Sequence, residues 1–425
     1  MEKVDFILQG AKQLVTCAGY GKPKRGSAMQ DVGIISDGAL AMEAGKIVAL
    51  GTTPEVRDQF NARRIVDVGD RTVCPGFVDP HTHLVFGGDR VAEFEMRIKG
   101  ATYMEIMEAG GGIVSTMKAT REMPLRRLVE QSLRRLKYMF DMGTTTIEVK
   151  TGYGLDTASE LKMLQVIADL DVQHPADVIP TFLGAHAVPP EFKGRTDDYV
   201  NLVINEMLPA VQTAVKDARI NRLPFCDVYC ENNAFDLEQT RKILEAGRKF
   251  EFPIKIHADE FNNLGGVGLA IEMDAVSVDH LDVTNPDEIK KLAESFTVAV
   301  LLPAVNFNFG SSKFADARAM IDAGVTLALA TDYNPGSAPC LSMPLTMAIA
   351  CRYQRITPAE ALNACTINAA WAIGMGDRVG SLEVGKQADI LILDVPDYRH
   401  LSYQFGVNLV NRVIKKGKIV IDHER

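Results

Sequence analysis

The chain has 425 residues, of which 47 % are hydrophobic and 24 % charged, values that permit a large core and give no sign of disorder. A net charge of −9 argues against a surface that follows the phosphates of a nucleic acid or an anionic membrane. No apolar run approaches the ~20 residues of a membrane-spanning helix, and the first residues lack the pattern of a signal peptide. We therefore expect a cytoplasmic protein whose seven cysteines are free thiols.

The two ends of the chain carry similar β-rich patterns. Gly45 and Gly417 each begin a Gly-Lys-Ile-Val sequence next to apolar-rich runs, which indicates a hairpin turn at both positions. Short strands are predicted throughout 1–72 and 379–425, on either side of a central unit at 73–378. We expect the terminal segments to combine into one small β-sandwich domain.

The central unit alternates short β-branched runs with helical patterns. Helices are predicted over 125–142, introduced by Pro124, and over 237–250, behind the N-cap residue Asp236. Eight strand-like runs end on polar or Gly/Pro residues in the segments 75–83, 144–154, 178–189, 226–234, 253–260, 275–282, 297–305 and 325–334. This alternation predicts an α/β fold of the (β/α)8 TIM barrel type, with a doubly wound open sheet as the rival. The barrel is favoured because it gathers all the strand ends, where the titratable residues fall, in one circle.

Metal-ligand residue types stand at three of these strand ends. His81 and His83 follow an apolar strand and, with a strand period of two, point to the same side. His257 ends the fifth run and Asp332 the eighth. Three imidazoles and one carboxylate, with a position left for water, suit one Zn²⁺ or Fe²⁺ ion rather than calcium or magnesium. The alternative for each residue is a structural role, as a buried histidine or a helix-capping aspartate.

Two further residues are candidates for proton transfer together with Asp332. His280, at the end of the sixth run, can ligate the metal or hydrogen-bond a metal-bound water and move protons. The second role is favoured because four ligands already exist. Glu260, three residues beyond His257, is a predicted general base, and an exposed loop glutamate is the alternative.

The sequence Pro-Gly-Phe-Val-Asp-Pro-His-Thr-His at 75–83 resembles the opening motif of the amidohydrolase superfamily of metal-dependent hydrolases, and His257, His280 and Asp332 follow in that family's order. The resemblance implies a distorted (β/α)8 barrel with a β domain built from both termini. Some members bind two metals bridged by a carboxylated lysine at the end of the fourth strand, which here reads Tyr-Cys-Glu-Asn. One metal per chain is therefore expected. Lys150 could be this bridging lysine displaced by one or two strands, but the favoured interpretation is an ion-paired structural lysine.

Narrower motifs at 81–90, 148–154, 182–189 and 331–337 are similar to those of superfamily members that act in histidine degradation. Those enzymes open the ring of 4-imidazolone-5-propanoate to give N-formimidoyl-glutamate. The resemblance covers nearly the whole chain and implies metal ligation by His81, His83, His257 and Asp332. It also implies that eight residues surround substrate and product: Arg90, Tyr103, Tyr153, His186, Glu260, Asn334, Gly336 and Ser337.

The implied substrate fits the chemistry of these residues. Arg90 offers a forked donor pattern that matches the propionate carboxylate, with a surface arginine as the alternative reading. His186 and Tyr153 are expected to orient the ring. Related enzymes lead us to expect a homodimer, without a nucleic-acid or membrane partner.

Two other functions remain open at this point. One is another amidohydrolase reaction, as in a deaminase or a dihydropyrimidinase-like ring opener, and the narrow motifs argue against it. The other is a non-catalytic scaffold, which the four retained ligand residues argue against. The sequence does not decide whether the metal is zinc or iron, because the same ligands accept both metals.

Overall fold

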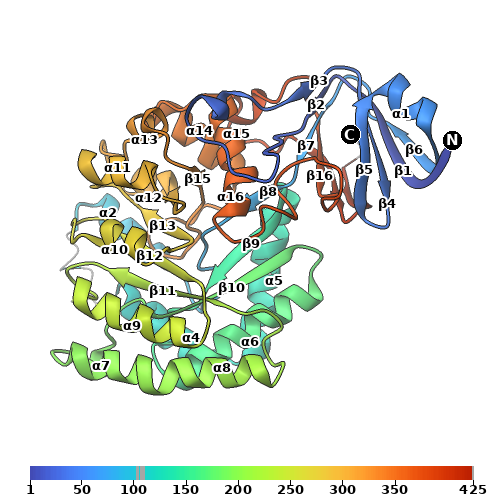
Figure 1. Cartoon of the computed structure of the whole chain (residues 1–425). Coiled ribbons are helices and arrows are strands. Elements are labelled where there is room, and N and C mark those ends of the chain that lie inside the picture. Colours follow the sequence, from blue (N-terminus) through green and yellow to red (C-terminus); the bar gives the residue numbers. More distant parts are fainter. Residues whose placement is uncertain (102–104, 106–110, 424–425) are drawn as a thin grey trace.

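The computed structural model describes every residue except 102–104, 106–110 and 424–425 (Figure 1). Its largest sheet has eight parallel strands, ordered so that each pairs with its neighbours in sequence. The strands are β8 (Phe77–Asp79), β9 (Thr144–Lys150), β10 (Asp177–Ala185), β11 (Phe225–Cys230), β12 (Ile254–Ala258), β13 (Ser277–His280), β14 (Val298–Leu301) and β15 (Leu327–Leu329). Each predicted strand run overlaps one of them. The predicted TIM barrel is confirmed, and the open-sheet alternative does not apply.

The first and last strands of the barrel, β8 and β15, are joined by hydrogen bonds to the Asp79 side chain and by contacts between the residues that follow the two strands. The hydroxyl of Thr331 donates to the Asp79 carboxylate at 2.6 Å, and the backbone N–H of Thr331 donates to the same group at 3.1 Å. Beyond the strands, the backbone N–H of Asp332 donates to the carbonyl oxygen of His81 at 3.1 Å, and Thr82 forms a bridge with Tyr333. Closure of the barrel therefore brings the segment of Asp332 beside that of His81.

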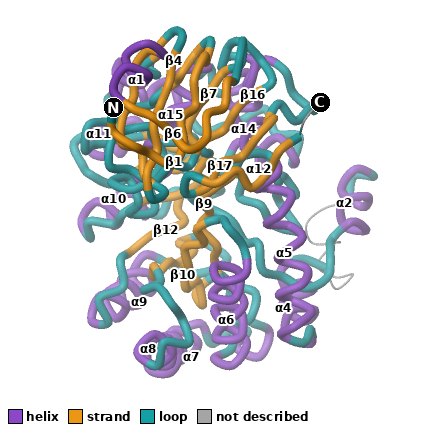
Figure 2. Tube along the Cα trace, turned by 90° about the vertical axis from the view of Figure 1, so that its right-hand side faces the viewer, coloured by secondary structure: helices purple, strands orange, loops and turns teal. Residues whose placement is uncertain are grey.

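Helices surround the barrel strands in both views (Figures 1 and 2). Both predicted helices are present, since α5 spans Leu125–Asp141 and α9 spans Leu237–Lys249. Asp236 caps α9 by accepting the backbone N–H of Gln239 at 2.8 Å. Within the described residues, the other α-helices that follow the first barrel strand are α2 (Val91–Ile98), α4 (Ile113–Glu122), α6 (Thr157–Gln173), α7 (Thr196–Leu202), α8 (Leu208–Lys216), α10 (Gly266–Glu272), α11 (Pro286–Ala293), α12 (Pro303–Asn308), α13 (Ala317–Ala323), α14 (Met343–Tyr353), α15 (Pro358–Ala364), α16 (Ile367–Trp371) and α17 (His400–Tyr403).

The terminal segments form a two-sheet domain at one end of the molecule (Figure 1, upper right). One sheet contains β5 (Lys46–Thr52), β4 (Gly38–Glu43), β1 (Glu2–Ala11) and β6 (Phe60–Asp67), and α1 (Thr53–Gln59) packs on it. The other contains β18 (Lys418–Asp422), β17 (Val410–Lys415), β16 (Ile390–Leu393), β7 (Thr72–Pro75), β2 (Gln13–Val15) and β3 (Ile34–Ile35). Phe6 and Leu40 of the first sheet share a core with Leu14 and Ile390 of the second, so the predicted composite β domain is confirmed.

The predicted hairpin turns connect β4 to β5 and β17 to β18. Gly45 and Gly417 have φ values of 78° and 72°, and the residue before each also has positive φ. This backbone is typical of the two-residue hairpin turn in which the second position favours glycine. The two turns lie against each other, because a Cβ on Gly417 would stand 3.2 Å from the Cα of Gly45. The domain boundaries at 72/73 and 378/379 remain predictions.

A buried ion cluster joins the β domain to the barrel. Lys415 of β17 lies 2.7 Å from the carboxylates of both Asp177 and Asp389, and its ammonium donates to the carbonyl oxygen of Thr145 at 2.9 Å. Thr145 and Asp177 belong to the first residues of β9 and β10. The β domain therefore contacts the barrel at the amino ends of these strands, which leaves their carboxyl ends for the site. Of the helices described, none is long and apolar enough to cross a membrane.

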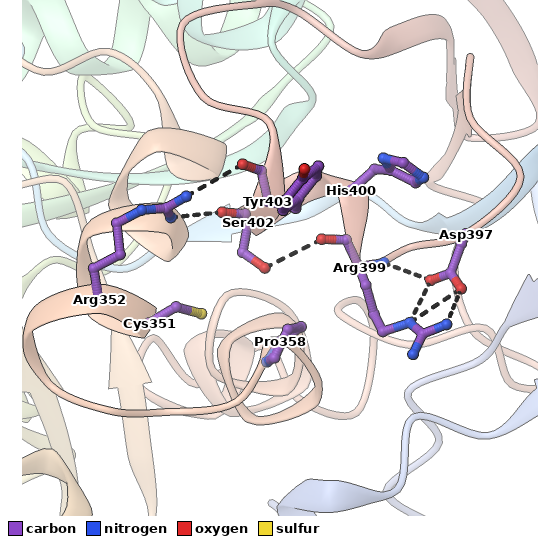
Figure 3. A pocket seen from close by; sticks show the side chains of 8 residues that line it. All are labelled: Cys351, Arg352, Pro358, Asp397, Arg399, His400, Ser402 and Tyr403. Carbon is purple, nitrogen blue, oxygen red and sulfur yellow. Dashed lines mark hydrogen bonds and ion pairs between the residues drawn. The ribbon is translucent and has the colours of Figure 1, made fainter.

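A surface cavity of about 440 Å³ lies beside α14 and α17 (Figure 3). Both of its guanidinium groups already have partners. Arg399 donates to the Asp397 carboxylate at 2.9 Å, and Arg352 donates to the carbonyl oxygen of Ser402 at 2.8 Å. No predicted site residue is among those that line it.

Candidate metal centre and active site

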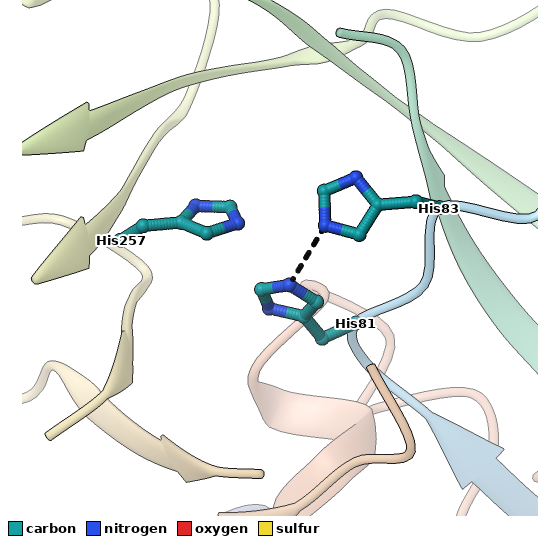
Figure 4. Close-up of side chains that lie close together, drawn as sticks. All are labelled: His81, His83 and His257. Carbon is teal, nitrogen blue, oxygen red and sulfur yellow. Dashed lines mark hydrogen bonds between the residues drawn. The ribbon is translucent and has the colours of Figure 1, made fainter. Parts of the chain in front are cut away.

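Five side chains converge at the carboxyl ends of the barrel strands. His81 and His83 follow β8, His257 lies in β12, His280 ends β13 and Asp332 follows β15. All five residues are at most 3 % exposed. Nε2 of His81 lies 3.3 Å from Nε2 of His83, and the rings of His81 and His257 have centroids 4.5 Å apart, so the three imidazoles face one point (Figure 4). Barrel closure thus gathers all four predicted metal ligands and His280 in one cluster.

The geometry of this cluster fits a metal ion. One potential ligand atom from each of His81, His83 and His257 lies within 4.8 Å of the others, and the same holds for His81, His280 and Asp332. Nε2 of His257 and Oδ1 of Asp332 are buried and have no hydrogen-bond partner within the described chain. Such unpaired buried polar atoms are costly unless a bound group satisfies them.

Burial also prepares the histidines as ligands. It lowers the pKa of His83 to about 3, with the charge of Lys150 adding to the effect, and lowers the pKa of His257 to about 4 although Asp227 opposes it. Both imidazoles are therefore neutral at pH 7, which is the form that binds a metal ion. The donor set of imidazoles and one carboxylate suits zinc or a similar divalent transition metal.

Glu260 and His280 form a second part of the site. The side chain of Glu260 is only 11 % exposed, and its carboxylate accepts the hydroxyl of Tyr229 at 2.8 Å. Nε2 of His280 lies 3.7 Å from the same carboxylate oxygen. Burial raises the pKa of Glu260. Burial alone would lower the pKa of His280, but the charges of Glu260 and Asp332 outweigh this effect, so the pKa of His280 is raised. The buried position favours a role in the site over the alternative of an exposed loop glutamate.

His186 and Tyr153 line the side of the cluster next to His83. The ring of His186 stacks on that of His83 with centroids 4.8 Å apart, and the Tyr153 ring lies 5.3 Å from His186. Nδ1 of His186 is 3.0 Å from the carbonyl oxygen of Gly152. Gly152 has φ of 106°, and a Cβ there would stand 2.8 Å from Nδ1 of His186, so glycine is required at this close approach.

Arg90 and the loop after Asp332 lie against each other. Nε of Arg90 donates to Glu93 at 2.7 Å, and Glu93 also accepts the backbone N–H of Gly112 at 3.0 Å. A Cβ on Gly336 would overlap Nη1 of Arg90, so the guanidinium packs directly on the Gly336 backbone. The predicted residue Tyr103 lies outside the described residues.

The loop itself is organised by one amide side chain. Asn334 Oδ1 accepts the backbone N–H groups of Gly336 and Ser337, each at 2.8 Å. Its Nδ2 donates to the carbonyl oxygen of Asp332 and to the hydroxyl of Ser337, each at 2.7 Å. Because the amide is occupied in this way, Asn334 shapes the loop that carries Gly336 and Ser337.

Sequence reasoning did not identify the carboxylates behind the histidines. Oδ2 of Asp279 lies 2.6 Å from Nδ1 of His81, and Nδ1 of His257 lies 3.0 Å from the Asp227 carboxylate. Tyr229, the partner of Glu260, was also missed. The strand period could have indicated both residues, because it places Asp227 and Tyr229 on the same face of β11.

The nearly closed barrel carries a buried cluster of histidines and an aspartate at its carboxyl end. This is the architecture of a metal-dependent amidohydrolase. Residues 233–420 match the model of the amidohydrolase family. The fold is similar to that of an adenosine deaminase from Xanthomonas campestris solved with bound zinc, with a TM-score of 0.72, 20 % identity, and coverage of 99 % of this chain and 94 % of that one.

The curated relatives narrow this class. An imidazolonepropionase from Chloroflexus aggregans is 55 % identical over 100 % of both chains. One from Herpetosiphon aurantiacus is 49 % identical over 99 % of this chain and 98 % of the relative. The chain belongs to the imidazolonepropionase family. It is a hydrolase that opens the cyclic amide of 4-imidazolone-5-propanoate to N-formimidoyl-glutamate in histidine degradation, as predicted, and the other amidohydrolase reactions have less support.

Proposed function

We propose that His81, His83, His257 and Asp332 hold one zinc or iron ion, which serves the ring-opening reaction. The observation that carries the proposal is the convergence of these buried groups, with Nε2 of His257 and Oδ1 of Asp332 lacking a hydrogen-bond partner in the described chain. The zinc in the adenosine deaminase of similar fold supports zinc as the first choice. The bound ion would lower the pKa of water toward about 7 and polarise the ring carbonyl.

The protein groups around the cluster can supply the proton transfers. Glu260, fixed by the hydroxyl of Tyr229, accepts a proton as water adds to the ring carbonyl carbon. The same proton passes to the ring nitrogen as the C–N bond breaks, so the reaction consumes one water and needs no other reactant. His280 and Asp332 stabilise the charge that moves through this path, because His280 lies beside Glu260 and Asp332 belongs to the cluster.

The substrate is recognised by groups on the other side of the cluster. Arg90 binds the propionate carboxylate through its Nη groups, since Glu93 engages only its Nε. His186 and Tyr153 orient the ring by contacts near His83. The backbone of Gly336 and the hydroxyl of Ser337 line the same side, and Tyr103 is proposed as a further contact on the sequence resemblance alone.

One experiment tests the proposed function as a whole. Turnover of freshly generated 4-imidazolone-5-propanoate is followed by the loss of its ultraviolet absorbance, on protein whose metal content is measured in the same preparation. Rapid loss with about one zinc or iron per chain supports the proposal. Turnover by protein that holds no metal would reject the metal centre, and metal without turnover would reject the substrate.

The Arg90→Ala variant is expected to raise KM strongly for the propionate-bearing substrate, because a charge-assisted bidentate contact to its carboxylate is lost. The loss of such a contact, at about 1.5–3 kcal/mol, corresponds to a factor of roughly 10 to 150. The measurement compares KM for the substrate with KM for an imidazolone that lacks the tail. Equal increases for the two compounds would remove Arg90 from carboxylate binding.

The Gly336→Ala variant is expected to raise KM in the same direction, because the new Cβ overlaps Nη1 of Arg90 and displaces the guanidinium. The matched control is Gly268→Ala, since a Cβ at Gly268 in α10 meets no atom within 4 Å. Steady-state kinetics on both variants check this expectation. A wild-type KM in Gly336→Ala would show that substrate binding does not depend on the position of Arg90.

The assembly and location of the protein remain proposals. We propose a homodimer in the cytoplasm, on the basis of related enzymes, with no nucleic-acid partner because of the net charge of −9. The mass of the purified protein in solution, measured by sedimentation, tests the dimer.

A further inference from the structure

A layer of charged side chains lies inside the barrel, behind the histidine cluster. It consists of Glu148 and Lys150 of β9, Asp227 of β11, Lys255 of β12 and Asp279 of β13. Each of these residues is at most 1 % exposed. Charges buried to this extent are tolerated only when they are paired and hydrogen-bonded. The layer is therefore a built arrangement whose parts depend on one another, and the proposed reaction does not use it directly.

Lys150 lies at the centre of this layer. Its ammonium donates to Glu148 and to Asp227, each at 2.8 Å, and lies 3.5 Å from Asp279. Lys255 is less central: it donates to the carbonyl oxygen of Pro80 at 2.9 Å and lies 3.1 Å from Glu148 and 3.8 Å from Asp279. Lys150 is thus an ion-paired lysine, as the sequence indicated, and it contacts both carboxylates that face the histidines.

The two carboxylates connect Lys150 to two proposed metal ligands. Asp279 faces Nδ1 of His81 at 2.6 Å, and Asp227 faces Nδ1 of His257 at 3.0 Å. A neutral imidazole carries one proton, so a carboxylate that accepts it at Nδ1 leaves the lone pair on Nε2. Nε2 is the atom of His81 that approaches His83 and Asp332, and the unpaired atom of His257.

We propose that Lys150 is a positioning residue for the metal centre, which holds Asp227 and Asp279 in the orientation that fixes Nε2 of His257 and His81 toward the ion. The inference rests on the proposed assignment of these histidines as ligands. Without the ammonium, the two carboxylates lose the group that they share, and repulsion among the three buried acids turns them away from the histidines. Metal affinity then falls although every ligand is still present.

The test compares Lys150→Met with Lys415→Met, using zinc alone and a competing chelator. Lys415 is the matched control because it is also a buried lysine between two carboxylates, Asp177 and Asp389, but at the domain junction. Zinc affinity is expected to fall about 10-fold to 100-fold in Lys150→Met, the range found when groups behind metal ligands are changed. Affinity in Lys415→Met is expected to stay at the wild-type value. Equal affinities in Lys150→Met and wild type would overturn the proposal.

A second readout separates positioning from general destabilisation. In the metal-free protein, nitrogen NMR of labelled histidines is expected to show the proton on Nδ1 of His81 and His257 in wild type and in Lys415→Met, and a mixture of tautomers in Lys150→Met. If Lys150→Met does not fold, Asp227→Asn and Asp279→Asn carry the test, and each is expected to weaken zinc binding about 10-fold. Wild-type affinity in both would overturn the proposal.

The ligand assignment is tested separately with His257→Ala. Loss of zinc from this variant, together with unchanged zinc affinity in Lys150→Met, would leave the proposed centre standing and reject the role of Lys150. Zinc affinity unchanged in His257→Ala would reject the centre itself, and with it the reason for the inference.

Discussion

The His257→Ala variant is expected to lose its bound metal and to turn over substrate about 10³-fold more slowly or worse, because a catalytic ion supplies several kcal/mol of charge stabilisation. His257 contributes a buried Nε2 that has no other partner in the described chain. Its removal takes away one of three imidazoles and also leaves the Asp227 carboxylate without the ring that it faces at 3.0 Å. Both effects disfavour occupancy of the site.

Metal content and kcat, measured on the same preparations, check this expectation. The matched control is His400→Ala, since His400 lies in α17 beside the surface cavity and away from the barrel cluster. Zinc added to the wild type is also expected to raise its melting temperature, because the ion binds only the folded state, and this increase should be smaller in His257→Ala. A variant that keeps one metal per chain and normal turnover would exclude His257 from the centre.

The Glu260→Gln variant is expected to lower kcat by about 10²-fold to 10⁴-fold while metal content stays the same, because an amide cannot accept the proton of the attacking water. The substitution keeps the size of the side chain and the acceptor for the hydroxyl of Tyr229. Glu260 lies 3.7 Å from His280 and is three residues beyond His257, so it is close to the cluster without being one of the proposed ligands. The change therefore separates proton transfer from metal binding.

The control for this variant is Glu272→Gln, which alters an exposed carboxylate paired with Arg241 on the outside of the barrel. It is expected to leave both kcat and metal content unchanged. Turnover and metal analysis are measured together for the two variants. Normal turnover in Glu260→Gln would transfer the role of first proton acceptor to His280.

Much of the fold follows from local sequence patterns. The strand runs and the helices at 125–142 and 237–250 were predicted from β-branched residues, helical periodicity and end signals such as Asp236. These signals extend over a few residues, so they can be recognised without knowledge of the rest of the chain. The helix ends agree within one residue, because the caps that stop α5 and α9 are local.

The candidate site was predictable to a smaller extent. His81 and His83 could be assigned to one face from the strand period alone, and the order of His257, His280 and Asp332 matched a known pattern. The same period places Asp227 and Tyr229 on one face of β11, but it does not say which residues they contact. Tyr229 neighbours His257 only through the register of β11 with β12, and this register depends on pairing between distant segments.

The class of chemistry could be predicted from the metal-ligand residue types at the strand ends, because ligand types and strand period are local properties of the chain. Which carboxylate faces which histidine depends on how the barrel strands pair and close. Asp279 lies beside His257 in the register of β13 with β12, yet it faces His81, which is 198 residues away. The reason is that closure of the barrel turns inward side chains toward a common centre, where contacts are set by strand register and curvature rather than by neighbours in the chain.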